Sequence, residues 1–530
     1  MVSLSESRTY AILKCVSKCN HYVQACTDVI NDNLDDENVI NSSLFEELLY
    51  NVIESLAEKY VCIRDSNLLG YEHIDFLRRV AGTKEECNTY PVIDSLDNYH
   101  DIVAKMYPEF GGKSCINITF QVTEDCNLKC TYCYQHNKAH RVLKFEDAKT
   151  LIDQILTEDP KVTKYVKCTD YKACVLDFIG GEPFLEIDLI EEITQYFVHR
   201  LIELNHPWLA TYMVSISSNG ILYEDERVQN YIRKHNKIVS LSVTVDGTRE
   251  LHDKCRVFPN GDPTYDIAHA ACMDCKRKSG IDTSKITLAP DNITYFADCI
   301  LQMLSDGFNT IHANFVFEDG WTNEHARIYY DQVKQLTSTL ADKKIYGFDC
   351  DLITRECTPI DPARTENWCG GTGSMLCLSP NGAIYPCVRY APSSIGSDAA
   401  AFDIGSVIEG IGTNPKWEER INTLRSITRQ SQSSDECLNC PVADGCGWCS
   451  AYNYECFGTA NKRATYICCM HKARALASVF YNNTNYILGN SSKIYNVLLP
   501  ASECIKIIGE DNYRELVDLT LRIGGSVCDL

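Results

Sequence analysis

Apolar residues in the first part of the chain follow the spacing of a helix face. Alternating intervals of four and three residues separate the apolar positions Ile12, Val16, Cys19, Val23, Cys26 and Ile30. Residues at these intervals share one side of a helix. Ser43 and Glu46 form a capping box ahead of a second apolar face. The pattern predicts an N-terminal helical accessory domain over residues 1–112, with Cys19 and Cys26 in its core.

From residue 113 the pattern changes to short apolar runs that alternate with amphipathic helical stretches. The strand-like runs lie at residues 115–122, 174–179, 212–217, 238–245, 285–289 and 311–317. Strands separated by helices predict parallel β/α units and an α/β fold, here a partial (β/α)6 barrel of the TIM type. In such barrels the ligand lies at the carboxyl ends of the strands. We expect the barrel over residues 113–345, a cysteine-rich domain over 346–485 and a C-terminal tail over 486–530.

Composition and charge narrow the class of protein. The 530 residues contain 50 basic and 72 acidic side chains, and an acidic surface repels phosphate backbones, so nucleic acid is not an expected partner. The chain shows no basic-then-apolar segment at its start and no apolar run of about 20 residues. We therefore expect a cytoplasmic protein with no membrane partner.

The 29 cysteines point to metal ligands and free thiols, because disulfide frameworks are typical of small secreted domains. Cys126, Cys130 and Cys133 stand three and two residues apart, just after the first predicted strand. Three thiolates at this spacing can bind three irons of a [4Fe–4S] cube and leave the fourth iron open. On spacing alone a zinc site is the alternative, with His136 or His140 as its fourth ligand.

This cysteine run, with Tyr132 as the aromatic residue before its third cysteine, resembles the signature of the radical S-adenosylmethionine (SAM) superfamily. The resemblance implies that Cys126, Cys130 and Cys133 are the catalytic cluster ligands and that SAM chelates the open iron. An electron from the cluster then cleaves SAM to a 5′-deoxyadenosyl radical. In such an enzyme the cofactor carries the reaction, and the protein binds and orients it.

Further family motifs follow the predicted strands in order. They comprise Gly180, Gly181, Glu182 and Pro183 after the second strand, Ser218 and Asn219 after the third, Thr244 and Asp246 after the fourth, then Arg256, and Ala289 at the end of the fifth. By resemblance, the first motif binds the SAM amino group and the next two bind the ribose. The arginine pairs with the SAM carboxylate, a task that suits a bidentate guanidinium, and the alanine flanks the adenine.

Eight cysteines in the C-terminal half form a second pattern, which resembles the SPASM extension that binds two auxiliary [4Fe–4S] clusters. Family order assigns Cys369, Cys377, Cys387 and Cys449 to one cluster, and Cys437, Cys440, Cys446 and Cys468 to the other. Two residues separate Cys446 from Cys449, where the family has three. Cys456 and Cys469 are near enough in sequence to compete with Cys468 as the last ligand. Structural zinc is the alternative for this domain.

Longer runs around Gly180, Cys369 and Cys449 resemble radical SAM/SPASM maturases whose peptide targets carry Cys-x-x-x repeats. The resemblance implies a ribosomally synthesised precursor peptide, sulfur-to-carbon thioether cross-links and a low-potential electron donor of the flavodoxin or ferredoxin type. It also makes peptide recognition a candidate task for residues 1–112. In sulfatase maturases an aspartate base follows the third SPASM cysteine, whereas Val388 follows Cys387 here. The alternatives are another radical reaction on a peptide, such as epimerisation, a carbon–carbon cross-link or sulfatase-type maturation, or a non-catalytic iron–sulfur scaffold.

Overall fold

The computed structural model describes residues 113–528, apart from residues 205, 207, 209–210, 237, 319, 362–368 and 397–399. The helical domain expected over residues 1–112, with Cys19, Cys26 and the Ser43 capping box, lies outside the described residues.

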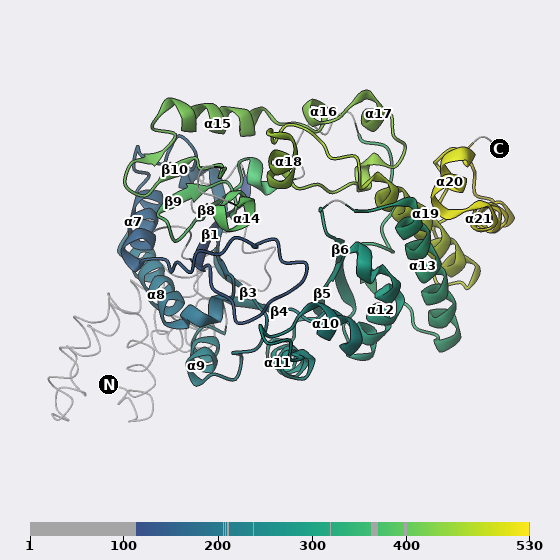
Figure 1. Ribbon diagram of the computed structural model, residues 1–530, viewed down its shortest axis with the longest axis horizontal. Coiled ribbons are helices and arrows are strands. Elements are labelled where there is room, and N and C mark those ends of the chain that lie inside the picture. The colour runs from purple at the N-terminus through teal and green to yellow at the C-terminus, as the bar shows by residue number, and fades with distance from the viewer. Residues whose placement is uncertain are drawn as a thin grey trace, which may run out of the picture.

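The six expected strands are present and form the wall of a partial barrel (Figure 1). They are β1 (Lys113–Thr123), β2 (Tyr171–Gly180), β3 (Tyr212–Ser218), β4 (Val239–Val243), β5 (Thr283–Leu288) and β6 (Thr310–Phe315). Strands β1 to β4 pair in parallel and in chain order, and β5 pairs with β6, which pairs with the short β7 (Asp349–Cys350). The α/β fold with a parallel sheet is confirmed.

Helices cover the outer face of these strands. They are α7 (Phe145–Leu156), α8 (Ile187–Glu203), α9 (Glu226–Lys234), α10 (Arg249–Cys255), α11 (Tyr265–Ser279), α12 (Phe296–Ser305) and α13 (Asn323–Lys343). Their first turns are capped where the sequence supplies short polar residues: Asp225 accepts a hydrogen bond from the backbone of α9, and Thr322 from that of α13. In α12 the buried Phe296, Cys299 and Ile300 recur at helical spacing, which turns one apolar face toward the sheet.

The inner face of the strands is polar. Successive side chains of a strand point to opposite faces, and in β3 and β4 the positions between the buried Val214, Ile216 and Leu241 are mostly serines. Met213, at one of these alternate positions, is 45% exposed. The barrel interior is therefore not filled by apolar side chains, which leaves room for a ligand at its centre.

The cysteine-rich region continues the same sheet. Strand β8 (Met375–Leu378) pairs in parallel with β1, so that Cys377 lies opposite Thr119. Strands β9 (Ala383–Tyr385), β10 (Gly405–Ser406) and β11 (Gly410–Ile411) extend the sheet in antiparallel fashion, in the order β11-β10-β9-β8-β1-β2-β3-β4. The boundary expected at residues 345/346 therefore separates segments that share one hydrogen-bonded sheet.

The short helices of the cysteine-rich region lie across one side of the barrel (Figure 1). They are α14 (Pro392–Ile395), α15 (Pro415–Ser426), α16 (Arg429–Gln432), α17 (Asp435–Leu438) and α18 (Ser450–Phe457), followed by the long α19 (Cys468–Ile487). Helix α19 packs against α13, where the Phe480 ring meets the Tyr330 ring edge-on at 6.0 Å.

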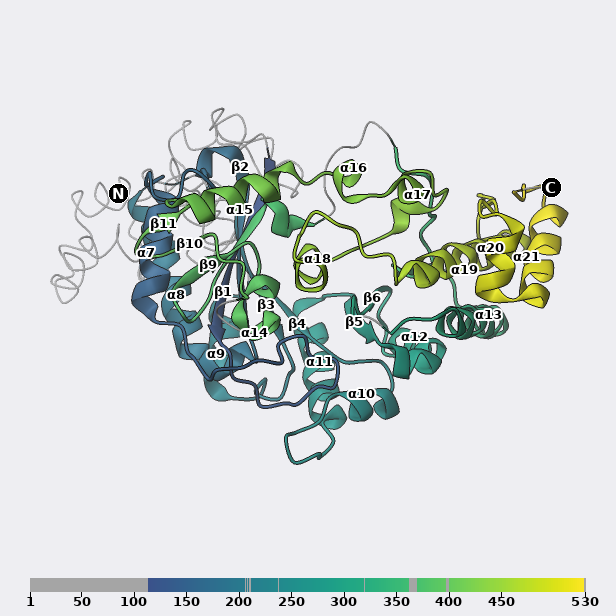
Figure 2. The same cartoon turned by 45° about the horizontal axis from the view of Figure 1, so that its top comes forward.

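The expected C-terminal tail contains two helices instead, α20 (Ala501–Ile508) and α21 (Glu510–Arg522). Both lie beside α13 and α19 (Figure 2). The Asn512 side-chain amide donates a 2.8 Å hydrogen bond to Asp331 of α13, and Cys504, Ile508 and Leu516 are buried. Apolar burial at helical spacing explains why the segment folds onto the core. Within the described residues, no helix has the length and apolar character needed to cross a membrane.

Candidate functional site

A cavity of about 450 Å³ lies at the carboxyl ends of the barrel strands. Its walls come from the loop after β1, from the ends of β2 to β6 and from the cysteine-rich region. Eleven of the residues predicted for SAM and its cluster line it: Cys126, Cys130, Tyr132, Cys133, Gly180, Gly181, Glu182, Ser218, Asn219, Thr244 and Arg256. Segments up to about 130 residues apart in the chain thus meet where the barrel geometry places a ligand. Cys449, which was predicted for an auxiliary cluster, lines the cavity as well.

The three thiols of the loop after β1 face this cavity. Backbone N–H groups of Lys129 and Thr131 donate to the carbonyl oxygens of Val257 and Cys255, at 2.8 and 2.9 Å, and fasten the loop to the end of α10. Burial raises the pKa of the Cys130 thiol to about 11. A coordinated metal reverses this effect, because it holds a ligating thiol in its deprotonated form.

Gly180 and Gly181 let the end of β2 press against the same loop. A Cβ at Gly181 would lie 2.1 Å from the carbonyl oxygen of Asp125, and one at Gly180 would lie 2.6 Å from that of Thr123. Both separations are far below contact distance, so only glycine fits at these positions. The two glycines fix the loop that carries Cys126 against the neighbouring strand.

Glu182 joins the ends of β2 and β3. Its buried carboxylate accepts hydrogen bonds from the Phe184 backbone (3.1 Å), the Ser218 hydroxyl (2.8 Å) and the Asn219 backbone (2.8 Å). Burial raises the pKa of Glu182, while these donors act in the opposite direction. The Asn219 amide donates to Asn127 at 2.7 Å. Glu182 therefore acts as a structural acceptor that positions two cavity-lining residues.

Arg256 carries a donor suited to an anionic ligand. One Nη donates a 2.9 Å hydrogen bond to the Tyr132 hydroxyl, and this hydroxyl in turn donates to the Asp246 carboxylate. The Nε–H of Arg256 is buried and has no hydrogen-bond partner among the described residues. An unsatisfied buried donor is costly, and a ligand carboxylate in the cavity would satisfy it.

Three of the residues predicted to contact SAM do not line the cavity. Asp246 is fully buried, and its carboxylate accepts hydrogen bonds from the Tyr132 hydroxyl and, at 3.2 Å, from the Thr287 backbone; its contact with the ribose stays a prediction. Ala289 donates its backbone N–H to Asn292 at 2.7 Å. Pro183 begins a short buried 3₁₀ turn.

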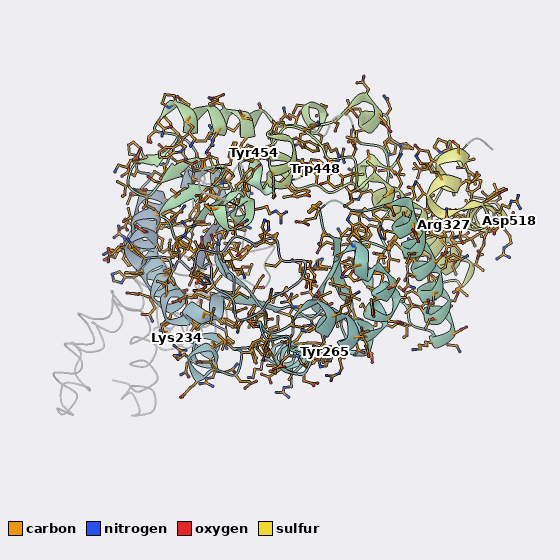
Figure 3. The ribbon with its side chains drawn as sticks, viewed as in Figure 1. Lys234, Tyr265, Arg327, Trp448, Tyr454 and Asp518 are labelled. Carbon is orange, nitrogen blue, oxygen red and sulfur yellow. The ribbon has the colours of Figure 1, made fainter. Side chains whose placement is uncertain are left out.

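The cavity also has walls that the sequence analysis did not predict. They include Lys138, Lys285, Thr287, Asn314, Glu318 and Arg389. Period-two alternation in β5 and β6 is the signal that could have identified the strand residues among them. Two large aromatic side chains labelled in Figure 3, Tyr265 at the start of α11 and Trp448 of the cysteine-rich region, lie outside this lining.

A second set of thiols lies beside this cavity. A Cβ at Gly371 would lie 3.5 Å from the sulfurs of both Cys369 and Cys387, so these two thiols face one point. Burial, and then the nearby thiols of Cys369, Cys449 and Cys377, raise the pKa of Cys387. Burial raises the pKa of the Cys449 thiol to about 11. The four cysteines that family order places on one auxiliary cluster are therefore neighbours.

A third set of thiols lines a separate cavity of about 240 Å³, formed by Cys437, Cys440, Cys446 and Cys468 together with the basic Arg463 and Lys472. The two competing cysteines lie elsewhere. Cys469 directs its sulfur to the Tyr466 carbonyl at 4.0 Å, and Cys456 is exposed. The arrangement favours Cys468 as the fourth member.

The described residues contain no group of three or more Cys, His, Asp or Glu side chains that could hold a single metal ion. Zinc would draw its thiolates to one centre, with Zn–S distances of about 2.3 Å. A four-iron cube needs them further apart, because each thiolate binds a different iron. Thiols that line a cavity together are suited to such a four-iron cube.

Comparisons with known proteins agree with this geometry. Residues 120–298 match the model of the Radical SAM superfamily. An uncharacterised protein of Methanocaldococcus jannaschii is 29% identical over 148 residues, which cover 28% of this chain and 44% of that protein. A cysteine-type anaerobic sulfatase-maturating enzyme of Clostridium novyi is 27% identical over 156 residues, which cover 28% of this chain and 37% of that enzyme. The chain thus matches less than half the length of either relative.

The fold is shared with a solved structure, native anSMEcpe with bound AdoMet and Cp18Cys peptide. It superposes with a TM-score of 0.51 at 17% sequence identity, over 71% of this chain and 99% of that chain. The shared fold includes the barrel and extends beyond the matched superfamily segment.

Replacing Arg256 with methionine should weaken SAM binding. Loss of a charge-assisted contact to the SAM carboxylate is expected to raise the Kd by about 10- to 100-fold, as measured by equilibrium dialysis of the iron-loaded protein under anaerobic conditions. Arg249→Met is the matched control, because Arg249 lies on α10 but pairs with the exposed Asp266. A Kd within about twofold of wild type for Arg256→Met would show that the guanidinium does not bind SAM.

Replacing Cys468 with alanine should remove iron, whereas Cys469→Ala should not. We expect Cys468→Ala to lose up to about four irons per chain, one cube, as measured by inductively coupled plasma mass spectrometry after anaerobic reconstitution. The reverse result, with iron lost only in Cys469→Ala, would place the fourth ligand at the neighbouring position.

Three separate observations converge on the barrel. A loop with three thiols faces a cavity at the carboxyl ends of its strands, a buried guanidinium with an unpaired N–H lies in the same wall, and residues 120–298 match a single superfamily model. SAM and a [4Fe–4S] cluster are the cofactors of that superfamily, and the thiols and the arginine are suited to hold them. Residues 120–298 of this chain therefore form a radical SAM domain.

Proposed function

We propose that the protein is a radical SAM enzyme that modifies a ribosomally synthesised precursor peptide with Cys-x-x-x repeats by forming sulfur-to-carbon thioether cross-links. The observation that carries this proposal is that one cavity is lined both by Cys126, Cys130 and Cys133 and by Cys449 of the second thiol set. Such a cavity lies between the centre that generates a radical and a second redox centre.

The chain's own residues divide into those that hold the cofactors and those that shape the site. Cys126, Cys130 and Cys133 would hold the SAM cluster, which together with SAM supplies removal of a hydrogen atom from carbon. Arg256 would bind the SAM carboxylate, with Tyr132 and Asp246 fixing the guanidinium. The second and third thiol sets would hold one auxiliary cluster each.

A peptide substrate is supported by the relatives and by the cavity. The Clostridium novyi relative is named as an enzyme that matures sulfatases, which are protein substrates. Polar and charged side chains such as Lys138, Asn314 and Glu318 line the cavity and can contact a peptide held at near-attack distance from the reacting centre. A low-potential donor of the flavodoxin or ferredoxin type would supply the electrons.

Sulfatase-type maturation is the second candidate, favoured by the named sulfatase-maturating relative. In that reaction class the position after the third SPASM cysteine holds an aspartate base, whereas Val388 and Arg389 follow Cys387 here. Arg389 is cationic and already forms an ion pair with Glu318. It cannot accept a proton, because a guanidinium keeps its charge in proteins.

The test is mass spectrometry of a precursor peptide with Cys-x-x-x repeats, after anaerobic co-expression with the protein, reduction and thiol alkylation. Each thioether removes two hydrogens and protects one cysteine from alkylation. We expect this double signature, and fragmentation of the peptide would locate the acceptor carbon.

Other outcomes would contradict thioether formation. Hydrogen loss with every cysteine alkylated would indicate carbon–carbon bonds or desaturation. Deuterium incorporation from solvent without a further mass change would indicate epimerisation. Absence of deoxyadenosine from a fully iron-loaded protein would indicate a non-catalytic scaffold.

Replacing Cys387 with alanine should separate SAM cleavage from cross-linking. Cys387 belongs to the second thiol set and not to the SAM loop, so we expect deoxyadenosine formation to persist while most thioether product is lost. Both products can be quantified by liquid chromatography and mass spectrometry. Cys456→Ala is the control, because Cys456 is exposed and lies outside both cavities. Normal cross-linking by Cys387→Ala would exclude an auxiliary-cluster role for this set.

A further inference from the structure

The walls of the barrel cavity contain two carboxylates, Glu182 and Glu318. The Glu182 side chain is 1% exposed, and its two oxygens already accept hydrogen bonds from Phe184, Ser218 and Asn219. Protonating Glu182 would weaken contacts that hold the ends of β2 and β3 together. Glu182 is therefore committed to the framework, and Glu318 is the lining carboxylate that remains for proton transfer.

Glu318 follows β6 at the rim of the cavity. Its side chain is 39% exposed, and within the described part of the chain it has a single ion-pair partner, Arg389. The preceding Phe317 carbonyl accepts a 2.7 Å hydrogen bond from the Tyr466 hydroxyl, which anchors the segment to the cysteine-rich region. The carboxylate is thus held in place yet accessible from the cavity.

Arg389 is fixed in the wall beside Glu318. Its guanidinium lies 4.8 Å from the centroid of the Tyr134 ring and 5.3 Å from that of the Tyr452 ring. Its side chain is 13% exposed, and its Nε–H is buried without a hydrogen-bond partner among the described residues. A cation with an unused donor lowers the pKa of a thiol placed next to it, because it stabilises the thiolate.

Closing a thioether requires the substrate thiol to lose its proton. The S–H and C–H bonds break and one S–C bond forms. SAM and the cluster held by the first thiol set would supply removal of the carbon's hydrogen atom, and an auxiliary cluster held by the second set would take the one electron left over. The thiol proton needs a base. A positioned carboxylate can serve as that base.

We propose that Glu318 is the base that takes the proton from the substrate cysteine, and that Arg389 holds the resulting thiolate. This inference rests on the proposed function. It places the substrate sulfur between Tyr134 and Cys449, in the part of the cavity whose wall includes Glu318 and Arg389. The sulfur then stands between the SAM loop and the second thiol set, where the bond must form.

The test is the number of thioethers formed per deoxyadenosine by Glu318→Gln, with a peptide that carries one Cys-x-x-x repeat. We expect this ratio to fall by at least about tenfold at neutral pH, while the peptide Kd measured by fluorescence anisotropy stays within about threefold of wild type. Deoxyadenosine should continue to form, since Glu318 is not placed at the SAM site.

Raising the pH should restore the ratio in Glu318→Gln. A cysteine thiol has an ordinary pKa of about 8.5, so near pH 9 it ionises without a base. The charged and titratable groups around Glu318 are Arg389, Tyr466 and the cavity-lining Lys138 and Lys285. Arginine, lysine and tyrosine side chains titrate near or above about pH 10, so rescue at lower pH reports the substrate thiol.

Two variants control for loss of the ion pair or of folding. Glu455→Gln is the matched control, because Glu455 is the other acidic neighbour of Arg389, at 4.0 Å, and does not line the cavity. It should keep the wild-type ratio. Glu318→Asp keeps a carboxylate and should retain more cross-linking than Glu318→Gln, so the comparison remains informative if the glutamine variant is unstable.

Each contrary result has a distinct meaning. A wild-type ratio in Glu318→Gln would overturn the inference, and so would a loss that high pH does not restore. In both cases the proposed function stands as long as the wild-type enzyme forms thioethers. A wild-type enzyme that forms no sulfur–carbon bond would overturn the proposed function, and the inference with it.

Discussion

The pairing of β8 with β1 is the constraint on which the rest of the site depends. Strand β1 leads directly into the loop with Cys126, Cys130 and Cys133, and β8 carries Cys377. Their parallel ladder runs from Asn117 to Phe120 and fixes the two thiol sets relative to one another. Because β8 continues the barrel sheet, the cysteine-rich region cannot move as an independent domain without breaking backbone hydrogen bonds. The second thiol set, with Cys449 and Arg389, is thereby held at the barrel mouth.

The buried polar residues of the cavity show that the protein is organised for anionic and polar ligands. Asp246, Tyr132 and Arg256 form a chain of hydrogen bonds that still leaves one guanidinium N–H without a partner. Burying an unsatisfied donor costs about 1–3 kcal/mol. The fold tolerates this cost at two lining arginines, Arg256 and Arg389. Both costs would be recovered when a negatively charged group binds, one near the SAM loop and one near the second thiol set.

The sequence was sufficient to predict the barrel strands and to select residues that gather around one cavity. The six strands were predictable because their apolar runs are separated by amphipathic helices. Eleven residues predicted for SAM and its cluster line one cavity, because strand ends converge in a parallel barrel. The attachment of β8 to β1 was not predictable, since short strands of three or four residues carry too little periodicity to reveal their partners. The helices at Ala501–Ile508 and Glu510–Arg522 were missed although their apolar spacing is regular, because the chain end was assigned to a tail.

The roles of individual polar residues depended on partners that sequence patterns do not specify. Asp246 matched a family position for the ribose, and its carboxylate also accepts a hydrogen bond from the Tyr132 hydroxyl, 114 residues away. Glu318 and Arg389 are 71 residues apart and belong to no motif. The two side chains are brought together as an ion pair by the fold alone. A motif records which residues meet a shared cofactor, whereas this acid–cation pair is set by long-range packing. The pair was therefore accessible only after the strands and the cysteine-rich region were placed in space.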